Sequence, residues 1–141
     1  MALDYINISL RAWTQSKDCV PDGVFLDQLN CDSPLILEVS PSRRAWESAL
    51  VVLCQRELKN FSGEEKHDHF QQAIFEDLTK SAEWLTIHPP ELFREMRNSG
   101  LKIDIITTGW IDCDQLDLSF PSKFLAACGE RDLSITIITN E

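Results

Sequence analysis

The chain of 141 residues is long enough for one domain, and its 43% hydrophobic content with four tryptophans favours a folded globule over a disordered chain. Thirteen Lys and Arg against 23 Asp and Glu give a formal charge of −10. This balance opposes nucleic-acid binding, which depends on clustered cations. We find no apolar run of the roughly 20 residues that span a bilayer and no signal-peptide pattern, so we expect a cytoplasmic protein that binds neither nucleic acid nor membrane.

The five cysteines are odd in number, and none belongs to a Cys-X-X-Cys pair. Scattered cysteines in a chain without an export signal are typical of free thiols in a reducing compartment. Cys54 and Cys128 stand among apolar residues, and we predict that both are small core residues.

The first predicted element is a strand over residues 6–12, where apolar and polar side chains alternate. Ile6, Ile8, Leu10 and Ala12 point to one face of this strand. Residues 15–23 are rich in turn formers and predict a loop. The apolar run bounded by Pro34 and Pro41 predicts a second strand at 33–40.

A helix is predicted to begin at Ser40, which can cap it, with Pro41 at the first helical position. It continues through residue 58 with apolar positions three and four residues apart, at Trp46, Ala49, Leu50, Leu53 and Cys54.

A second helix is predicted from Asp68 to Thr86, with an apolar stripe at Phe70, Ala73, Ile74, Leu78, Ala82 and Leu85. It must end before Pro89-Pro90, because proline removes a backbone donor and clashes with the preceding turn. A short third helix follows over residues 90–98, and Gly100 provides its C-terminal stop.

The C-terminal region predicts a strand at 101–108, an interruption at Gly109 and a second extended run over 111–120. A short helix then starts at Pro121 and closes at Gly129, and residues 133–139 end the pattern as a strand. The element order is therefore β-β-α-α-α-β-β-α-β. We predict a single α+β domain over 1–141, with a mostly antiparallel sheet and helices packed on one face.

The segment around His67 and His69, with Glu64, Glu65 and Asp68, contains ligand types that suit zinc. Residues two apart on a helix face away from each other, so the spacing is poor for a shared ion. A polar helix N-terminus explains the same residues. We therefore predict no metal and no cofactor, and a metal-binding regulator or metal-dependent enzyme stays the alternative.

A second acidic cluster comprises Asp112, Asp114 and Asp117, directly after Trp110. Carboxylates on a hairpin can bind a cation or a basic partner, and they also protect a sheet edge from aggregation. An exposed tryptophan beside them would form a docking patch. Our candidate partner-binding residues are Trp110, Asp112, Asp114 and Asp117, with Glu64 and Glu65 as a second patch.

Catalytic motifs are missing from the sequence: it has no Gly-X-Ser-X-Gly elbow, phosphate-binding glycine loop or His-Glu-X-X-His. We predict no catalytic residues and no enzymatic activity.

The C-terminal run from Leu116 to Ile138 resembles the ending of small bacterial domains in which a strand leads to a short helix, a turn and a final amphipathic strand. The matching positions are Leu118, Phe120, Phe124, Leu125, Gly129, Leu133, Ile135 and Ile137. Such domains resemble immunity proteins, which are acidic α+β partners of bacterial toxins. The resemblance implies a non-catalytic protein that neutralises a cognate toxin by direct binding, and a basic, nuclease-like toxin would suit the negative charge. A homodimer is a further alternative.

Overall fold

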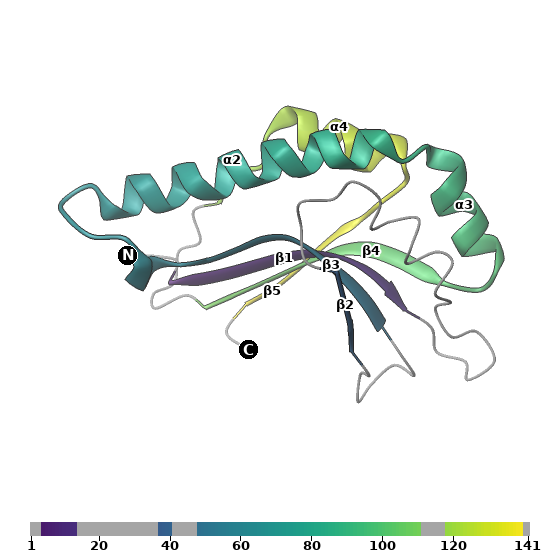
Figure 1. The fold of residues 1–141 in the computed structure, drawn as a ribbon, viewed down its shortest axis with the longest axis horizontal. Helices are drawn as coiled ribbons and strands as arrows, with labels where there is room; N and C mark the ends of the chain where they lie inside the picture. The colour runs from purple at the N-terminus through teal and green to yellow at the C-terminus, as the bar shows by residue number, and fades with distance from the viewer. Residues whose placement is uncertain (1–3, 14–36, 41–47, 111–117, 140–141) are drawn as a thin grey trace.

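The computed structural model describes residues 4–13, 37–40, 48–110 and 118–139. Five strands form one sheet in the order β2-β3-β1-β4-β5 (Figure 1). They are β1 (Tyr5–Trp13), β2 (Leu37–Ser40), β3 (Ser48–Glu57), β4 (Lys102–Trp110) and β5 (Ile135–Thr139). Every neighbouring pair is antiparallel except β4 and β5, which are parallel. The predicted, mostly antiparallel sheet is confirmed.

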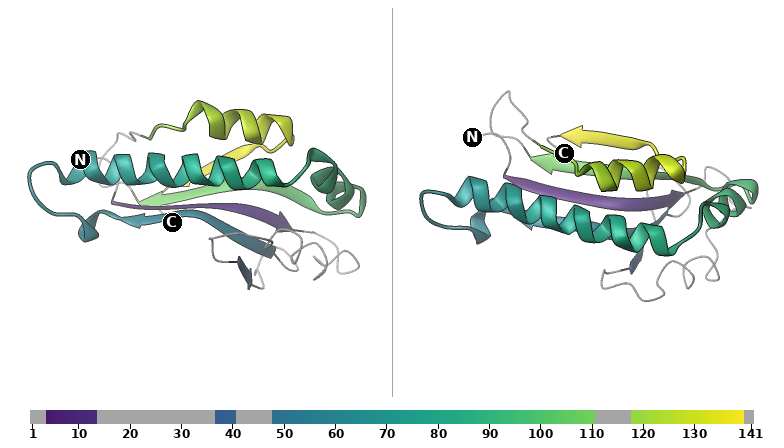
Figure 2. Two further views of the ribbon diagram at one scale, coloured as in Figure 1. Left: turned by 45° about the horizontal axis from the view of Figure 1, so that its top comes forward. Right: turned by 90° about the horizontal axis from the view of Figure 1, so that it is seen from above.

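The helical elements are the 3-10 turn η1 (Leu58–Asn60) and the helices α2 (Lys66–Ile87), α3 (Pro90–Asn98) and α4 (Ser122–Glu130). Figure 2 shows α2 and α4 lying side by side over the same face of the sheet, with α3 beyond its end. This arrangement confirms the predicted α+β class with helices on one face.

The core lies between this sheet face and the helices, and its residues follow the predicted periods. Ile6, Ile8, Leu10 and Ala12 of β1 are all buried, as the alternation predicts. On α2 the buried positions recur every three or four residues, at Phe70, Ile74, Leu78, Ala82 and Leu85. α4 contributes Phe124, Ala127 and Cys128.

The helix predicted from Ser40 through residue 58 is wrong where the structure describes it, because residues 48–57 form β3 between β1 and β2. Residues 49–54 are all apolar, and periodicity alone does not separate such a short run in a strand from a buried helix segment. The adjacent β-branched Val51 and Val52 favour the strand. Trp46 and the start of the predicted helix lie outside the described residues.

A β-bulge explains why consecutive residues of β3 are buried. Ile8 pairs with Cys54 and the next residue, Ser9, pairs with Val52, so Leu53 is the extra residue. Leu53 and Cys54 are both buried, and the Leu53 carbonyl accepts a hydrogen bond of 2.9 Å from the buried Ser81 hydroxyl of α2. The irregular strand backbone is thereby satisfied by the helix above it.

The predicted interruption at Gly109 is also wrong, because β4 continues through Gly109 to Trp110. Gly109 pairs with Ile6 on one side and with Thr139 on the other. Residues 118–120 are not in a strand, and the rest of the second extended run (111–117) lies outside the described residues. The last strand instead pairs with β4 in parallel after the crossover through α4, which a helix this short did not predict with certainty.

The helix boundaries depend on proline and on left-handed backbone positions. α2 ends at Ile87 before Pro89-Pro90, and α3 ends before Gly100, whose φ is 99°. α4 passes the predicted stop at Gly129 and ends at Glu130, and Asp132 takes the left-handed conformation with φ 56°. Aspartate tolerates this region better than most residues, so glycine is not required there.

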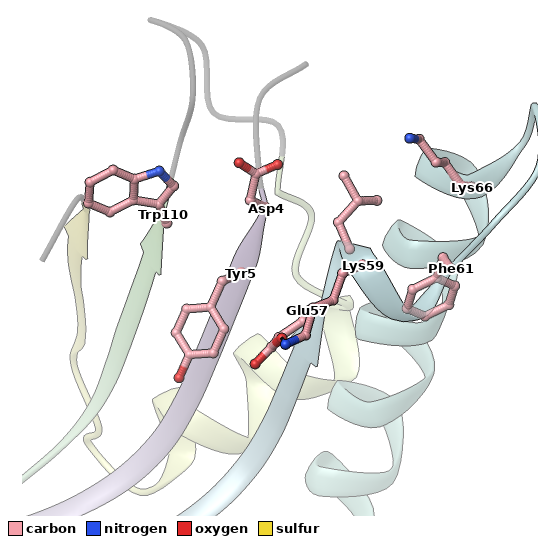
Figure 3. Close-up of a pocket in the computed structure, with 8 residues that line it drawn as sticks. Asp4, Tyr5, Glu57, Lys59, Phe61, Lys66 and Trp110 are labelled. Carbon is pink, nitrogen blue, oxygen red and sulfur yellow. Dashed lines mark ion pairs between the residues drawn. The ribbon is translucent and has the colours of Figure 1, made fainter.

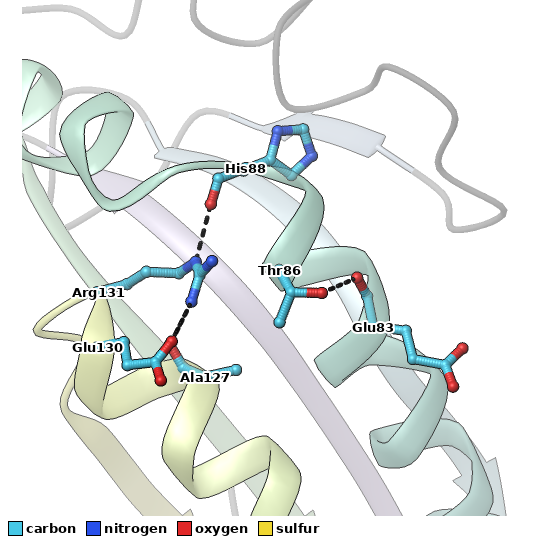
Figure 4. A network of polar contacts seen from close by, with 6 residues as sticks. All are labelled: Glu83, Thr86, His88, Ala127, Glu130 and Arg131. Carbon is cyan, nitrogen blue, oxygen red and sulfur yellow. Dashed lines mark hydrogen bonds and ion pairs between the residues drawn. The ribbon is translucent and has the colours of Figure 1, made fainter.

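A buried arginine joins the end of α4 to the junction between α2 and α3 (Figure 4). Arg131 is 4% exposed, and its Nε donates to the His88 carbonyl at 2.9 Å while Nη1 donates to the Ala127 carbonyl at 3.1 Å. Arg97 of α3 donates to the Arg131 and Asp132 carbonyls at 2.9 and 2.7 Å. The two arginines thus satisfy carbonyls at the C-terminal ends of two helices, α2 and α4.

Candidate functional site

Three strand ends meet beside the start of α2, and backbone hydrogen bonds hold them in register. The Asp4 N–H donates to the Trp110 carbonyl at 2.9 Å, and the Leu58 N–H donates to the Asp4 carbonyl at 2.8 Å. Tyr5 pairs with Glu57 of β3 on one side and with Trp110 of β4 on the other. Directly paired residues point to the same side of a sheet, so Glu57, Tyr5 and Trp110 form a row on the face away from Ile6.

An open groove of about 610 Å³ lies over this end of the sheet (Figure 3). Aromatic side chains line it from three segments: Tyr5 begins β1, Trp110 ends β4, and Phe61 precedes α2. The Trp110 side chain is 50% exposed, which is unusual for so large an apolar group. The other residues that line the groove are Asp4, Glu57, Leu58, Lys59 and Lys66.

The groove's wall at Phe61 is fixed by packing and by one glycine. The Phe61 ring meets the buried Phe70 ring edge to face, with centroids 5.6 Å apart. Gly63 then turns the chain into α2 with φ 92°, a conformation that other residues adopt only with strain. The wall is therefore a preformed surface.

Charges of both signs surround the aromatic residues. Lys59 forms an ion pair of 2.9 Å with Glu57, and this hydrogen bond raises the pKa of the lysine. The Asp4 side chain forms no ion pair within the described part of the chain. Figure 3 shows its carboxylate beside Trp110 at the strand ends. An accessible carboxylate next to an indole ring is suited to a partner's guanidinium or ammonium group.

Of the six predicted partner-binding residues, three lie in the part of the chain that the structure describes. Trp110 is exposed as predicted and lies in the groove. Glu64 and Glu65 are also exposed, and they directly precede the groove residue Lys66 in the chain. Asp112, Asp114 and Asp117 lie outside the described residues.

The segment proposed as the alternative metal site forms the first turns of α2. His67 and His69 are two residues apart on the helix and therefore point to different sides. The His69 Nε2 lies 3.6 Å from a Glu65 carboxylate oxygen, on the exposed surface. Across the described ranges, no three His, Cys, Asp or Glu side chains are grouped closely enough to hold a metal ion.

The two described cysteines are buried free thiols, which confirms their predicted place in the core. Burial, reinforced by Asp77, strongly raises the pKa of Cys54. Burial also raises the pKa of Cys128, to about 11. Both thiols are therefore protonated at neutral pH, the unreactive form of cysteine.

His88 is the buried histidine of the described chain, and its ring meets Trp84 edge to face at 4.9 Å. Neither the Trp84 Nε1 nor the His88 Nε2 has a hydrogen-bond partner among the described residues. Burial, and secondarily the positive charge of Arg131, lowers the pKa of His88 below its ordinary value of 6.5. The folded protein thus favours neutral His88.

Acid is expected to destabilise the protein partly through His88. The unfolded chain protonates this residue near pH 6.5, whereas the folded chain protonates it only at lower pH. The stability that neutral His88 contributes is therefore present above pH 6.5 and lost as pH falls towards the folded pKa. Urea unfolding of His88→Asn should show a smaller loss between pH 7.5 and 5 than the parent. The exposed His69→Asn variant is the control, and an equal loss in all three proteins would contradict the assignment.

No family model matches the chain, and neither curated proteins nor solved structures give a match. None of the helices described here is long and apolar enough to cross a membrane.

Sequence reasoning missed Asp4, Tyr5, Phe61 and Lys66 as members of the groove. The exposed tryptophan was found because it stood next to the interruption predicted at Gly109, although the strand in fact continues to Trp110. The others depend on the pairing of β1 with both β3 and β4, which no local pattern encodes. A correct assignment of β3 as a strand ending at Glu57 would have been the useful signal.

Proposed function

We propose that this chain is an immunity protein: a non-catalytic binding protein that neutralises a cognate bacterial toxin by direct protein–protein contact. The observation that carries the proposal is the open groove at the strand ends, which the half-exposed Trp110 lines together with Tyr5, Phe61 and Asp4. Half-exposed aromatic side chains at a rigid site are the anchors around which protein interfaces concentrate their binding energy. Such a site needs no reactive group.

The charge of the chain supports a basic partner. A formal charge of −10 speeds association with a cationic protein and opposes association with nucleic acid. A nuclease, or another enzyme with an anionic substrate, carries cationic side chains at its active site. In the proposed complex, a toxin Arg or Lys enters the groove between Trp110 and Asp4, and Glu64 and Glu65 add negative potential at its margin.

Growth protection tests the proposal. Where the gene immediately upstream encodes a large multidomain protein, the C-terminal domain of that protein is the toxin to use, produced from an inducible promoter in a bacterial host. Co-expression of the chain should restore growth, and the two purified proteins should form a complex by calorimetry. The proposal fails if that domain stops growth and the chain neither binds it nor restores growth.

Trp110→Ala is expected to weaken toxin binding by roughly 30-fold or more, because loss of a central aromatic anchor costs about 2 kcal/mol or more. Asp4→Lys should mainly slow association, with a larger effect at low salt. The matched control is Phe75→Ala on α2, which removes another exposed aromatic ring away from the groove. Equal affinity of Trp110→Ala and the parent would show that the groove is not the interface.

Reversal of both Asp112 and Asp114 to lysine tests the predicted acidic patch separately. Full protection by that double variant would remove the patch from the interface while leaving the groove in place.

A further inference from the structure

Within the described ranges β5 is the last strand of the sheet, and alternate residues along it direct their backbone groups away from β4. The Ile105 N–H donates to the Ser134 carbonyl at 2.8 Å, which fixes the phase of the parallel ladder between β4 and β5. In such a ladder, alternate residues direct both their N–H and C=O to the neighbouring strand. Thr136 and Ile138 therefore bond to β4, and the backbone groups of three residues point to the open edge: Ile135, Ile137 and Thr139.

This edge lacks the features that usually prevent pairing. Edge strands are commonly protected by charge, proline, bulges or short length. Residues 133–140 contain no charged residue and no proline, and the register of β5 with β4 is continuous. The Ile137 side chain, at the centre of the strand, is 47% exposed. By comparison, the opposite edge strand β2 has only four residues.

We propose that β5 pairs with β5 of a second copy of this chain, antiparallel, about a two-fold axis at Ile137. In this register Ile137 lies opposite its own copy and Ile135 lies opposite Thr139, so each of the outward-pointing residues gains a partner for its N–H and its C=O. The two sheets then continue into one another across the axis.

The uncharged, self-complementary composition of β5 favours a second copy as the occupant. Two chains of formal charge −10 repel each other, and an uncharged segment is where they can approach at least cost. Every residue of β5 is Ile or Thr, so each cross-strand pair joins two β-branched side chains, which suit a pleated surface. A strand that meets its own copy about a two-fold axis forms an isologous contact that closes at two subunits.

The proposed dimer is independent of toxin binding. β5 runs parallel to β4, and its last residue, Thr139, pairs with Gly109 beside Trp110. An antiparallel pair of β5 strands therefore places the two grooves at opposite ends of the joined sheet. Loss of the dimer should leave toxin neutralisation unchanged, so failure of one proposal is distinguishable from failure of the other.

Sedimentation equilibrium and amide exchange test the dimer with the untagged, full chain. We expect a concentration-dependent monomer–dimer equilibrium. Ile137→Lys should weaken dimerisation at least tenfold, because it sets two like charges opposite each other at the axis. Leu125→Lys on α4 is the matched control, since Leu125 is also 47% exposed and the charge change is the same. Its dimerisation should equal the parent's.

Amide exchange by NMR on the parent protein requires no variant. Exchange at Ile135, Ile137 and Thr139 should slow at concentrations above the dimer midpoint, while Thr136 and Ile138 stay the same. Ile137→Pro provides a second variant, because it removes only an outward N–H and should also abolish the dimer. A monomer at all concentrations, or a dimer that both variants form normally, would overturn the proposal.

Discussion

Phe124→Ala is expected to lower the free energy of unfolding by about 3–5 kcal/mol, the usual cost of truncating a fully buried aromatic side chain. Phe124 belongs to α4, and its side chain is completely buried. Its ring stacks on that of Phe120, with ring centroids 6.1 Å apart. Because α4 is a short helix, its position over the sheet depends on this contact more than on its own helical stability. Urea denaturation followed by circular dichroism measures the change.

The neighbouring residue gives the control. Leu125→Ala removes an exposed aliphatic side chain from the same helix and should change the free energy of unfolding by no more than about 0.5 kcal/mol. If both variants lowered stability equally, helix propensity at these positions, rather than core packing, would account for the loss. Alanine is itself a good helix former, so the Phe124 result is not expected from propensity.

Arg131→Met is expected to destabilise the protein by several kcal/mol. Methionine replaces the unbranched methylene stem of the arginine but lacks the N–H groups that donate to the His88 and Ala127 carbonyls. A buried acceptor left without a partner costs about 1–3 kcal/mol, and two are affected. The loss should appear at pH 8, where His88 is neutral, because it does not depend on protonation. Thermal and urea unfolding both measure it.

Lys123→Met on the same helix is the matched variant for this experiment. Lys123 is exposed, so the change in formal charge is the same but no buried carbonyl loses a donor. Its stability should stay close to the parent's. A comparable loss in both variants would mean that the charge, rather than the two hydrogen bonds, stabilises the fold. Arg131→Met should also raise the pKa of His88, because the repulsive positive charge beside it is removed.

Elements with a strong local period were predicted correctly. The alternation of β1 and the three- and four-residue stripe of α2 each have one buried face, so the sequence reveals both the type of element and its orientation. The stop at Pro89-Pro90 and the left-handed Gly100 follow from backbone chemistry that no tertiary contact can override. These features needed no knowledge of neighbouring strands.

The errors have a common cause in non-local pairing. β3 lies between β2 and β1, and its apolar run fits a helical spacing as well as an extended one. Gly109 sits inside β4 because β1 and β5 bond to it from both sides, which glycine's weak strand preference does not anticipate. The candidate site has the same limit: Trp110 was identifiable from its position, whereas its companions Asp4 and Tyr5 depend on strand register.

The bulge at Leu53 affects the position of α2 over the sheet. Its carbonyl is displaced from the regular ladder and accepts the Ser81 hydroxyl, which makes one point on the strand distinct from all others for the helix above. Sliding α2 by a single turn would move Ser81 about 5.4 Å from that oxygen and leave both groups dry and unbonded. The bulge in the sheet therefore determines where α2 lies along its own axis.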